Sequence, residues 1–158
     1  MRSLKMISTV ALASFVFASS YGMQVQNFTR TFNSPYGVEK TVHRLENQLS
    51  KHHFNINAVM NIKALAKKEG MNIPATTLIL SCQPKYGAYL VKHNRNAALF
   101  LPIKFMVWSN QDTGQVKVRY WDPKKDVAQL YSQNNYEINN RIDAMSKKLA
   151  NMVRNATN

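Results

Sequence analysis

Cys82 has the greatest capacity for covalent chemistry in this sequence, and it is the only cysteine. It follows the apolar run 76–81 and precedes Pro84, so it stands where a buried strand gives way to a helix. The free N–H groups at a helix N-terminus favour a thiolate, and Lys85 adds positive charge. The alternative interpretation is a cysteine packed behind the strand end, because free cysteine is among the most buried residue types.

His93 is the histidine nearest to Cys82 in the sequence. Such a pair could activate the thiol or bind copper or zinc, although metal sites usually need three or four ligands. The two residues are therefore weak metal-site candidates. No cofactor is predicted, and metal or haem binding stays open.

A second candidate site is a basic surface edged by aromatic side chains, with Arg119 and Trp121 as its main residues. Both alternate with the apolar residues Val118 and Tyr120, so they fall on the opposite face of a strand. Cation–π contacts allow such a rim to bind anions or aromatic ligands. An ordinary solvated basic face has the same composition.

The charge of the chain is strongly positive, at +13 over 158 residues, and no Asp or Glu occurs between Met71 and Gln111. Such a surface attracts anions, including lipid headgroups and other cell-envelope components. No nucleic-acid recognition motif is present, so a specific nucleic-acid role is not predicted. The carboxylates form no evident acid–base pair, and phosphate-loop and nucleophile-elbow motifs are missing. Enzymatic activity is therefore uncertain, and the sequence leans against it.

Residues 1–22 have the three-part pattern of a secretory signal peptide: basic residues, an apolar stretch at 6–17, and then small residues. The apolar stretch is shorter than the roughly 20 residues of a membrane span, so no transmembrane anchor is predicted. Cleavage after Ser20 or after Gly22 satisfies the small-residue rule equally well. The sequence therefore predicts a periplasmic or secreted protein.

The rest of the chain, 23–154, has the length of a single domain, and residues 155–158 are expected to fray. Its patterning predicts an α+β fold: a largely antiparallel sheet, helices packed on one face, and a long C-terminal helix. Strands are predicted at 23–33, 54–62 (with Phe54, Ile56, Ala58, Met60 and Ile62 on one face), 76–81, 100–109 and 116–121. Helices are predicted from Ser34-Pro35 to about His52, at 63–69, from Pro84 to about Val91, at 122–130, and at 137–153 with the buried stripe Ile138, Ile142, Met145, Leu149 and Met152.

The segment Cys82-Gln83-Pro84-Lys85-Tyr86-Gly87-Ala88 resembles the Cys-Asn-Pro-Lys-type segment of domain-of-unknown-function family 302. Leu101-Pro102 resembles that family's Leu-Pro-containing strand, and the similarity extends to 34–39, 66–71 and 114–123. The resemblance implies a small α+β domain whose long C-terminal helix lies on an antiparallel sheet, with no established function. Many members carry a second cysteine directly after the Leu-Pro pair, where this chain has Ile103. The resemblance therefore implies that a pair of cooperating thiols is missing here.

Two hypotheses about function follow from these observations. The first is an exported, non-enzymatic module that binds a small ligand or an anionic envelope partner through its basic surface or a groove between sheet and helix. The second is a thiol-dependent redox, sulfur-handling or metal- or haem-binding protein centred on Cys82, with help from Lys85 and His93. The sequence leaves open whether the protein forms a homodimer, through a sheet edge or through Cys82.

Overall fold

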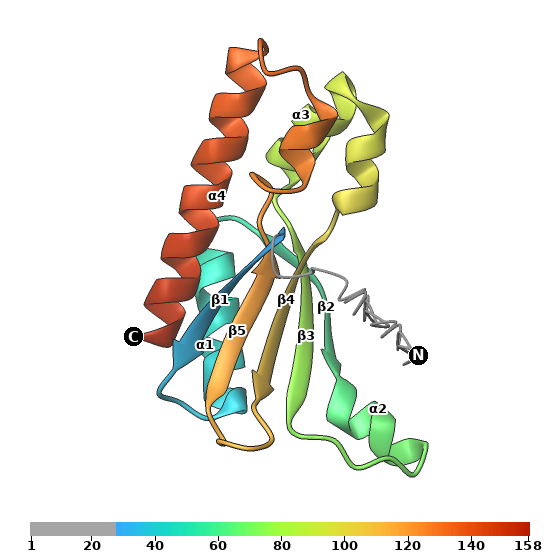
Figure 1. The fold of residues 1–158 in the computed structure, drawn as a ribbon, viewed down its shortest axis with the longest axis vertical. Coiled ribbons are helices and arrows are strands. Elements are labelled where there is room, and N and C mark those ends of the chain that lie inside the picture. Colours follow the sequence, from blue (N-terminus) through green and yellow to red (C-terminus); the bar gives the residue numbers. More distant parts are fainter. Residues whose placement is uncertain (1–27) are drawn as a thin grey trace, which may run out of the picture.

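The computed structural model describes residues 28–158, so the predicted signal peptide lies outside the described residues. Five strands form a sheet in the order β1-β5-β4-β3-β2, and every neighbouring pair is antiparallel (Figure 1). The strands are β1 (Thr29–Ser34), β2 (Asn55–Asn61), β3 (Thr76–Cys82), β4 (Ile103–Ser109) and β5 (Val116–Trp121). The predicted α+β fold with a largely antiparallel sheet is confirmed.

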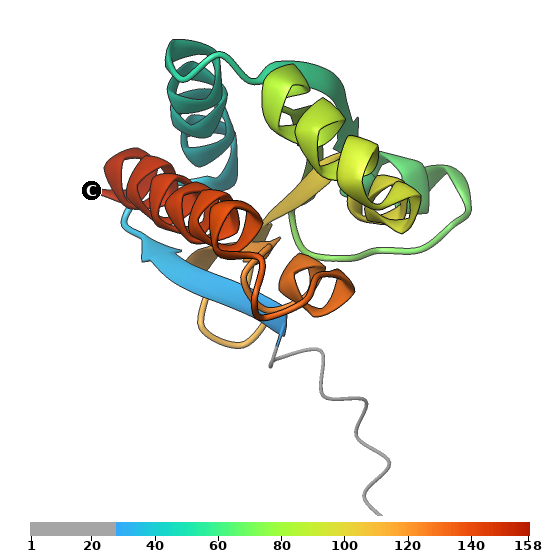
Figure 2. The same ribbon diagram turned by 90° about the horizontal axis from the view of Figure 1, so that it is seen from above.

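The two longest helices pack on one face of the sheet, and the shorter ones gather at its ends (Figures 1 and 2). They are α1 (Val38–Lys51) and α4 (Tyr136–Thr157) on the face, α3 (Pro84–His93), η2 (Arg95–Phe100) and η3 (Val127–Leu130) at one end, and α2 (Ile62–Lys68) at the other. Among the helices of residues 28–158, none combines the length and the apolar character that crossing a lipid bilayer requires.

The hydrophobic core lies between the sheet and helices α1 and α4. In β5, Val116, Val118 and Tyr120 point into it, which confirms the predicted alternation. Burying one such side chain contributes about 1.5–3 kcal/mol, so this layer is the main source of stability. The predicted stripe of α4 is buried at every position: Ile138, Ile142, Met145, Leu149 and Met152.

Helix α1 begins at Val38, not at Ser34 as the Ser-Pro pair predicts. Ser34 is the last residue of β1, where it pairs with Val116, and its hydroxyl hydrogen-bonds that of Thr41 at 2.8 Å. The N-cap is Gly37, which has no side chain to cap the helix. The pairing with β5 therefore holds Ser34 in the strand, and the helix starts one turn later than predicted.

Strand β2 contains a register shift that the alternation pattern did not predict. Ile56 lies opposite the buried Ser81, on the face that the helices cover, whereas Ala58 lies opposite Leu80 on the other face. An extra residue in one strand makes such a β-bulge. The prediction that residues 54–62 present a single apolar face is therefore wrong beyond the bulge.

The chain end is part of the fold, whereas residues 155–158 were predicted to fray. Helix α4 continues to Thr157, which is buried together with Ala156. Arg44 of α1 donates to the carbonyl oxygens of Ala156 at 2.7 Å and Asn155 at 2.9 Å. These bonds satisfy acceptors that a helix C-terminus otherwise leaves unpaired.

The segments that follow α3 and β5 differ most from prediction. The strand predicted at 100–109 begins only at Ile103, because η2 and the cis peptide before Pro102 precede it. The helix predicted at 122–130 is a turn followed by η3, which Asp126 caps by accepting the Val127 N–H. The segment around η2 was predicted as part of a strand, and the segment before η3 was predicted as a helix. In the structure these two connections form walls of a cavity.

Candidate functional site

Cys82 ends β3 and packs against α3. A methyl group built on Gly87 would lie 3.3 Å from Sγ of Cys82 and 3.0 Å from Cδ1 of Leu101, so an alanine there would require these side chains to shift by a few tenths of an ångström. Burial raises the pKa of the Cys82 thiol. Burial therefore acts against the predicted activation by the helix N-terminus and by Lys85, which is exposed, because desolvation disfavours the thiolate.

His93 lies at the opposite end of α3 from Cys82. Pro84 is the first residue of this helix and His93 the last, a separation of about 14 Å along the axis. The His93 Nδ1 donates to the Tyr89 carbonyl oxygen at 2.8 Å, and the two rings pack with centroids 4.5 Å apart. The hypothesis of a Cys82–His93 pair is wrong. Within residues 28–158, no three His, Cys, Asp or Glu side chains gather closely enough to hold a metal ion.

Lys85 lines a groove between α3 and α4 with a volume of about 320 Å³. Two further cations of this groove already have partners. Arg141 forms an ion pair with Glu137 at 3.2 Å, and Lys148 donates to the His52 carbonyl oxygen at 3.3 Å. The groove is therefore a weaker anion site than its composition indicates.

A second cavity lies where the end of β5 meets η2, and we call it the Trp121 pocket. Its volume is about 400 Å³, within the range of small-molecule sites. It adjoins an inner chamber of about 20 Å³, with which it shares Phe100, Trp121 and Asp126. Its lining consists of Leu99, Phe100, Pro102, Lys104, Trp121 and Asp126.

A third hollow continues the Trp121 pocket onto the face of the sheet that no helix of residues 28–158 covers (Figure 2). Its volume is about 240 Å³, and it shares Lys104 and Trp121 with the pocket. Arg119, Met106 and Leu78 also line it. Trp121, at 39% exposure, therefore stands where three hollows meet.

Two buried polar residues lie at the Trp121 pocket and its inner chamber: Asp126 lines both, and Tyr86 lines the inner chamber. Burial raises the pKa of Asp126 to about 6, against the stabilising Val127 N–H bond of 2.6 Å to its Oδ1. The Tyr86 hydroxyl lines the inner chamber and has no hydrogen-bond partner among residues 28–158. Burial and the nearby Asp126 charge raise the Tyr86 pKa, so this phenol is neutral. A buried hydroxyl without a partner costs about 1–3 kcal/mol, which a polar group of a ligand would recover.

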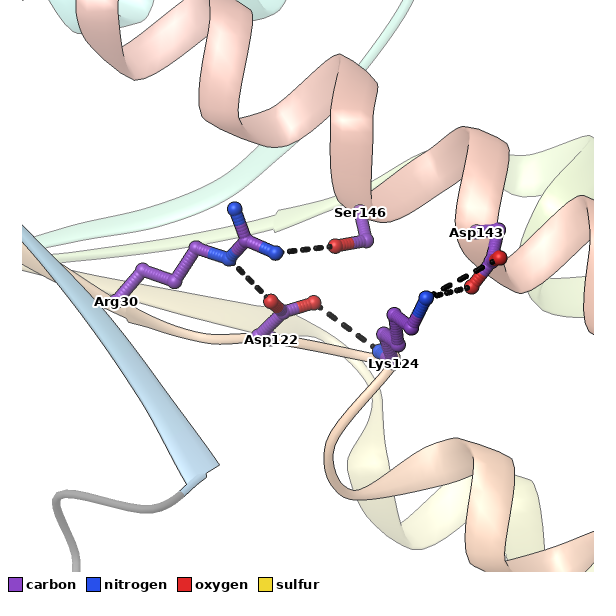
Figure 3. Close-up of polar contacts among 5 residues, drawn as sticks. All are labelled: Arg30, Asp122, Lys124, Asp143 and Ser146. Atoms are coloured by element: carbon purple, nitrogen blue, oxygen red, sulfur yellow. Dashed lines mark hydrogen bonds and ion pairs between the residues drawn. The ribbon is translucent and has the colours of Figure 1, made fainter.

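An ion-pair network fixes the chain immediately after Trp121 (Figure 3). Arg30 of β1 pairs with the fully buried Asp122 and donates to the Ser146 hydroxyl of α4 at 3.3 Å. The other Asp122 oxygen accepts the Lys124 N–H at 3.1 Å, and the Lys124 ammonium lies 3.1 Å from Asp143. The network ties β1, β5 and α4 together and so holds the pocket wall in place.

Lys104 and Arg119 supply the positive charge beside Trp121. Arg119 donates its Nε–H to the Thr31 hydroxyl at 2.9 Å and lies 5.2 Å from the Trp108 ring. Neither cation forms an ion pair with a carboxylate of residues 28–158. Lys104 is nevertheless near enough to Asp126 for its charge to lower the pKa of that carboxyl against the larger effect of burial, so the ionised carboxylate partly offsets this cation.

The structure thus brings together Arg119 and Trp121, and it places Cys82, Pro84, Lys85 and His93 outside this pocket. Sequence reasoning did not single out Asp126, which stood inside a predicted helix, or Tyr86. Besides the alternation that indicated Arg119 and Trp121, the stretch without Asp or Glu around Lys104 was the signal that pointed toward the pocket.

The fold and the pocket define a small α+β protein in which a five-stranded antiparallel sheet carries a long C-terminal helix. A crystal structure of an uncharacterized conserved DUF302 protein from Bacillus stearothermophilus has a similar fold. Its TM-score is 0.71 at 22% sequence identity, and the match covers 82% of this chain and 98% of that one. Residues 30–156 match the family described as "Domain of unknown function DUF302", and the chain belongs to this family.

Part of the chain is also similar to proteins named as fluoride-specific ion channels. The fluoride-specific ion channel FluC 1 of Brucella suis biovar 1 (strain 1330) is 29% identical over 93 residues, 59% of this chain and 36% of the channel. The FluC 1 protein of Brucella abortus biovar 1 (strain 9-941) has the same identity over 93 residues and is matched over 34% of its length. The chain spans about a third of the length of these curated relatives.

Proposed function

We propose that this protein is an exported, non-enzymatic module that binds a small amphiphilic anion in the Trp121 pocket. The observation that carries the proposal is the position of Trp121, which lies between an apolar cavity and two cations that lack carboxylate partners. Pockets with apolar walls and a few convergent polar groups are the usual small-molecule sites.

The lining indicates how such a ligand would lie. Its apolar part would pack between the Trp121 ring and the side chains of Leu99 and Phe100. Its anionic group would meet Lys104 and Arg119, which line the outer hollow. A negatively charged Asp126 would oppose the anion, so we expect binding to strengthen as the pH falls through about 6.

Three observations support a setting at the cell envelope. The first 22 residues have the composition of a signal peptide, and the net charge of +13 favours anionic partners. The FluC relatives are named as fluoride-specific ion channels, and the matched stretch is about a third of each sequence. A related segment therefore occurs in membrane proteins, which supports a role for this module beside a membrane.

The proposal is tested with anilinonaphthalene sulfonate, an aromatic anion that accepts energy from tryptophan. The chain has two tryptophans, so a Trp108→Phe variant makes Trp121 the only donor. We expect saturable quenching of Trp121 emission that is stronger at pH 5 than at pH 8. In that background, Lys104→Gln and Arg119→Gln should each weaken binding about fivefold, because each removes one charge-assisted contact.

The matched control is Lys147→Gln, which removes an equally exposed charge from α4, remote from the pocket lining. It should leave the affinity within twofold of the background. Asp126→Asn should abolish the difference between pH 5 and pH 8. The proposal is wrong if quenching is not saturable, or if Lys147→Gln weakens binding as much as Lys104→Gln does.

A further inference from the structure

The exposed apolar side chains of this protein concentrate on one projecting segment, residues 59–71, which we call the β2–α2 arm. Four of the seven large apolar side chains that are exposed in residues 28–158 belong to it: Val59, Met60, Leu65 and Met71. Isolated exposed apolar residues need no explanation, and Val59 and Met60 point to opposite faces of β2. The exposed apolar pair that calls for an explanation is therefore Leu65 and Met71. The arm consists of the end of the edge strand β2 and helix α2, which stands away from the other helices (Figure 1).

Helix α2 has little packing of its own to explain its presence. Five of its seven residues are exposed, and only Ala66 is buried. The helix is held at its two ends. Asn61 caps the first turn by accepting the Ala64 N–H at 2.9 Å. At the other end, Gly70 adopts a positive φ, and the Met71 N–H donates to the Ala66 carbonyl oxygen at 2.9 Å.

This C-terminal turn brings the Met71 backbone back to the last turn of α2. Leu65 is 44% exposed and Met71 is 56% exposed, so both side chains face solvent. Lys68 lies one turn beyond Leu65 on the same side of the helix, whereas Lys63 and Lys67 lie one turn apart on the opposite side. The arm therefore carries exposed apolar side chains on a helix with three exposed lysines, and Glu69 is its single acidic residue.

We propose that the β2–α2 arm docks on the surface of a membrane that contains anionic lipids. Leu65 and Met71 would enter the boundary between headgroups and acyl chains, while the three lysines contact the headgroups. The arm lines none of the cavities described above, so it presents a projection and not a groove. A projection with apolar tips and cationic flanks suits a soft, planar, anionic surface. A second copy of this chain would bring a second set of the same lysines, and the two sets would repel each other.

The test is sedimentation of the protein with vesicles, and it does not depend on the Trp121 pocket. Protein purified after expression of the full chain is mixed with vesicles of equal parts phosphatidylglycerol and phosphatidylcholine, or of phosphatidylcholine alone. We expect binding only to the anionic vesicles. The triple variant Lys63→Gln, Lys67→Gln, Lys68→Gln should lower the partition coefficient about a hundredfold, because each lysine contributes about fivefold near an anionic surface.

The matched control is Lys51→Gln, Lys92→Gln, Lys147→Gln, which removes the same charge from exposed positions on α1, α3 and α4. It should lower partitioning only a few-fold. A second variant, Leu65→Ser with Met71→Ser, keeps the charge and should also weaken binding at least tenfold. The proposal is overturned if the control triple binds as weakly as the arm triple, or if the apolar variant binds as well as the unaltered protein. It is also overturned if the arm variants abolish a dimer in solution, which would assign the arm to a second copy.

Discussion

At the scale of single residues, the Trp121 pocket contains a carboxylate, Asp126, whose charged form is destabilised by burial. Asp126 is buried, and its pKa is raised to about 6 from the ordinary 3.8. In the unfolded chain the same group titrates near 3.9. The folded state therefore binds a proton more tightly than the unfolded state does between about pH 4 and pH 6.

This difference predicts that Asp126 makes the protein less stable as the pH rises. Below pH 4 both states are protonated, so Asp126 contributes nothing to the pH dependence. Above pH 6 the fold must hold a buried charge, and the free energy of unfolding should have fallen by about 3 kcal/mol. The measurement is urea unfolding of the protein and of Asp126→Asn at pH 4 and pH 7.5.

Asp126→Asn is the informative variant because its amide oxygen can still accept the Val127 N–H. The difference in stability between the two proteins should grow in favour of the variant as the pH rises. Parallel pH profiles for the two proteins would show that Asp126 does not titrate in this range.

The residues of the site were predictable only where their chemistry is visible in a local pattern. Arg119 and Trp121 follow from strand alternation, and both line the hollows around the pocket. Cys82 and His93 attracted attention through their residue types, but one packs against a helix and the other lies at its far end. Asp126 acquires its properties from burial by η2 and β5, which no local pattern encodes.

At the scale of elements, the contact between α1 and the end of α4 holds the two helices that cover the sheet. Arg44 donates to the Ala156 and Asn155 carbonyl oxygens, and its guanidinium lies 4.6 Å from the Tyr36 ring. A positive charge at a helix C-terminus is also favourable for the helix dipole. Arg44 therefore acts as a cap that a second helix supplies.

We predict that Arg44→Gln lowers the free energy of unfolding by about 1–2 kcal/mol, since it removes charge-assisted hydrogen bonds to the last turn of α4. The measurement is the urea midpoint, together with amide hydrogen exchange at residues 153–157. Lys147→Gln removes a charge from the same helix at an exposed position and should change the midpoint little. If exchange at 153–157 does not accelerate in Arg44→Gln, the cap is not what orders the chain end.

The elements themselves were predictable wherever apolar periodicity is long and clear. The stripe of α4 and the alternation of β5 are both confirmed. Prediction failed where a tertiary contact overrides a local signal. Pairing with β5 keeps Ser34 in a strand, and a bulge in β2 reverses which face its later side chains occupy. Hydrogen bonds from Arg44 hold the last residues, whose sequence predicts fraying, in helix α4.

At the scale of the whole molecule, one face of the sheet carries the helices, and no helix of residues 28–158 covers the other (Figure 2). The hollow around Arg119 and Trp121 lies on that second face. The β2–α2 arm extends from one end of the sheet, while the Trp121 pocket lies at the opposite end (Figure 1). The two proposed binding surfaces are therefore far enough apart to be tested separately.

Export is a prediction about the whole chain, and it rests on residues outside those the structure describes. When the full chain is expressed in a Gram-negative host, we expect periplasmic protein whose N-terminus is Tyr21 or Met23, according to cleavage after Ser20 or Gly22. Intact mass measurement of the periplasmic fraction distinguishes the two. Replacing the basic residues Arg2 and Lys5 by Glu should cause the precursor to accumulate. An intact chain beginning at Met1 in the cytosol of the unaltered strain would contradict the prediction.

The strand order has a consequence for how this chain acquires its shape. Strand β1, the first strand of residues 28–158, pairs there only with β5, so Arg30 meets Asp122, which lies 92 positions further along the chain. Contacts this distant in sequence slow folding, because a long loop must close before they form. The sheet is therefore incomplete until β5 has been synthesised and can pair with β1 and β4.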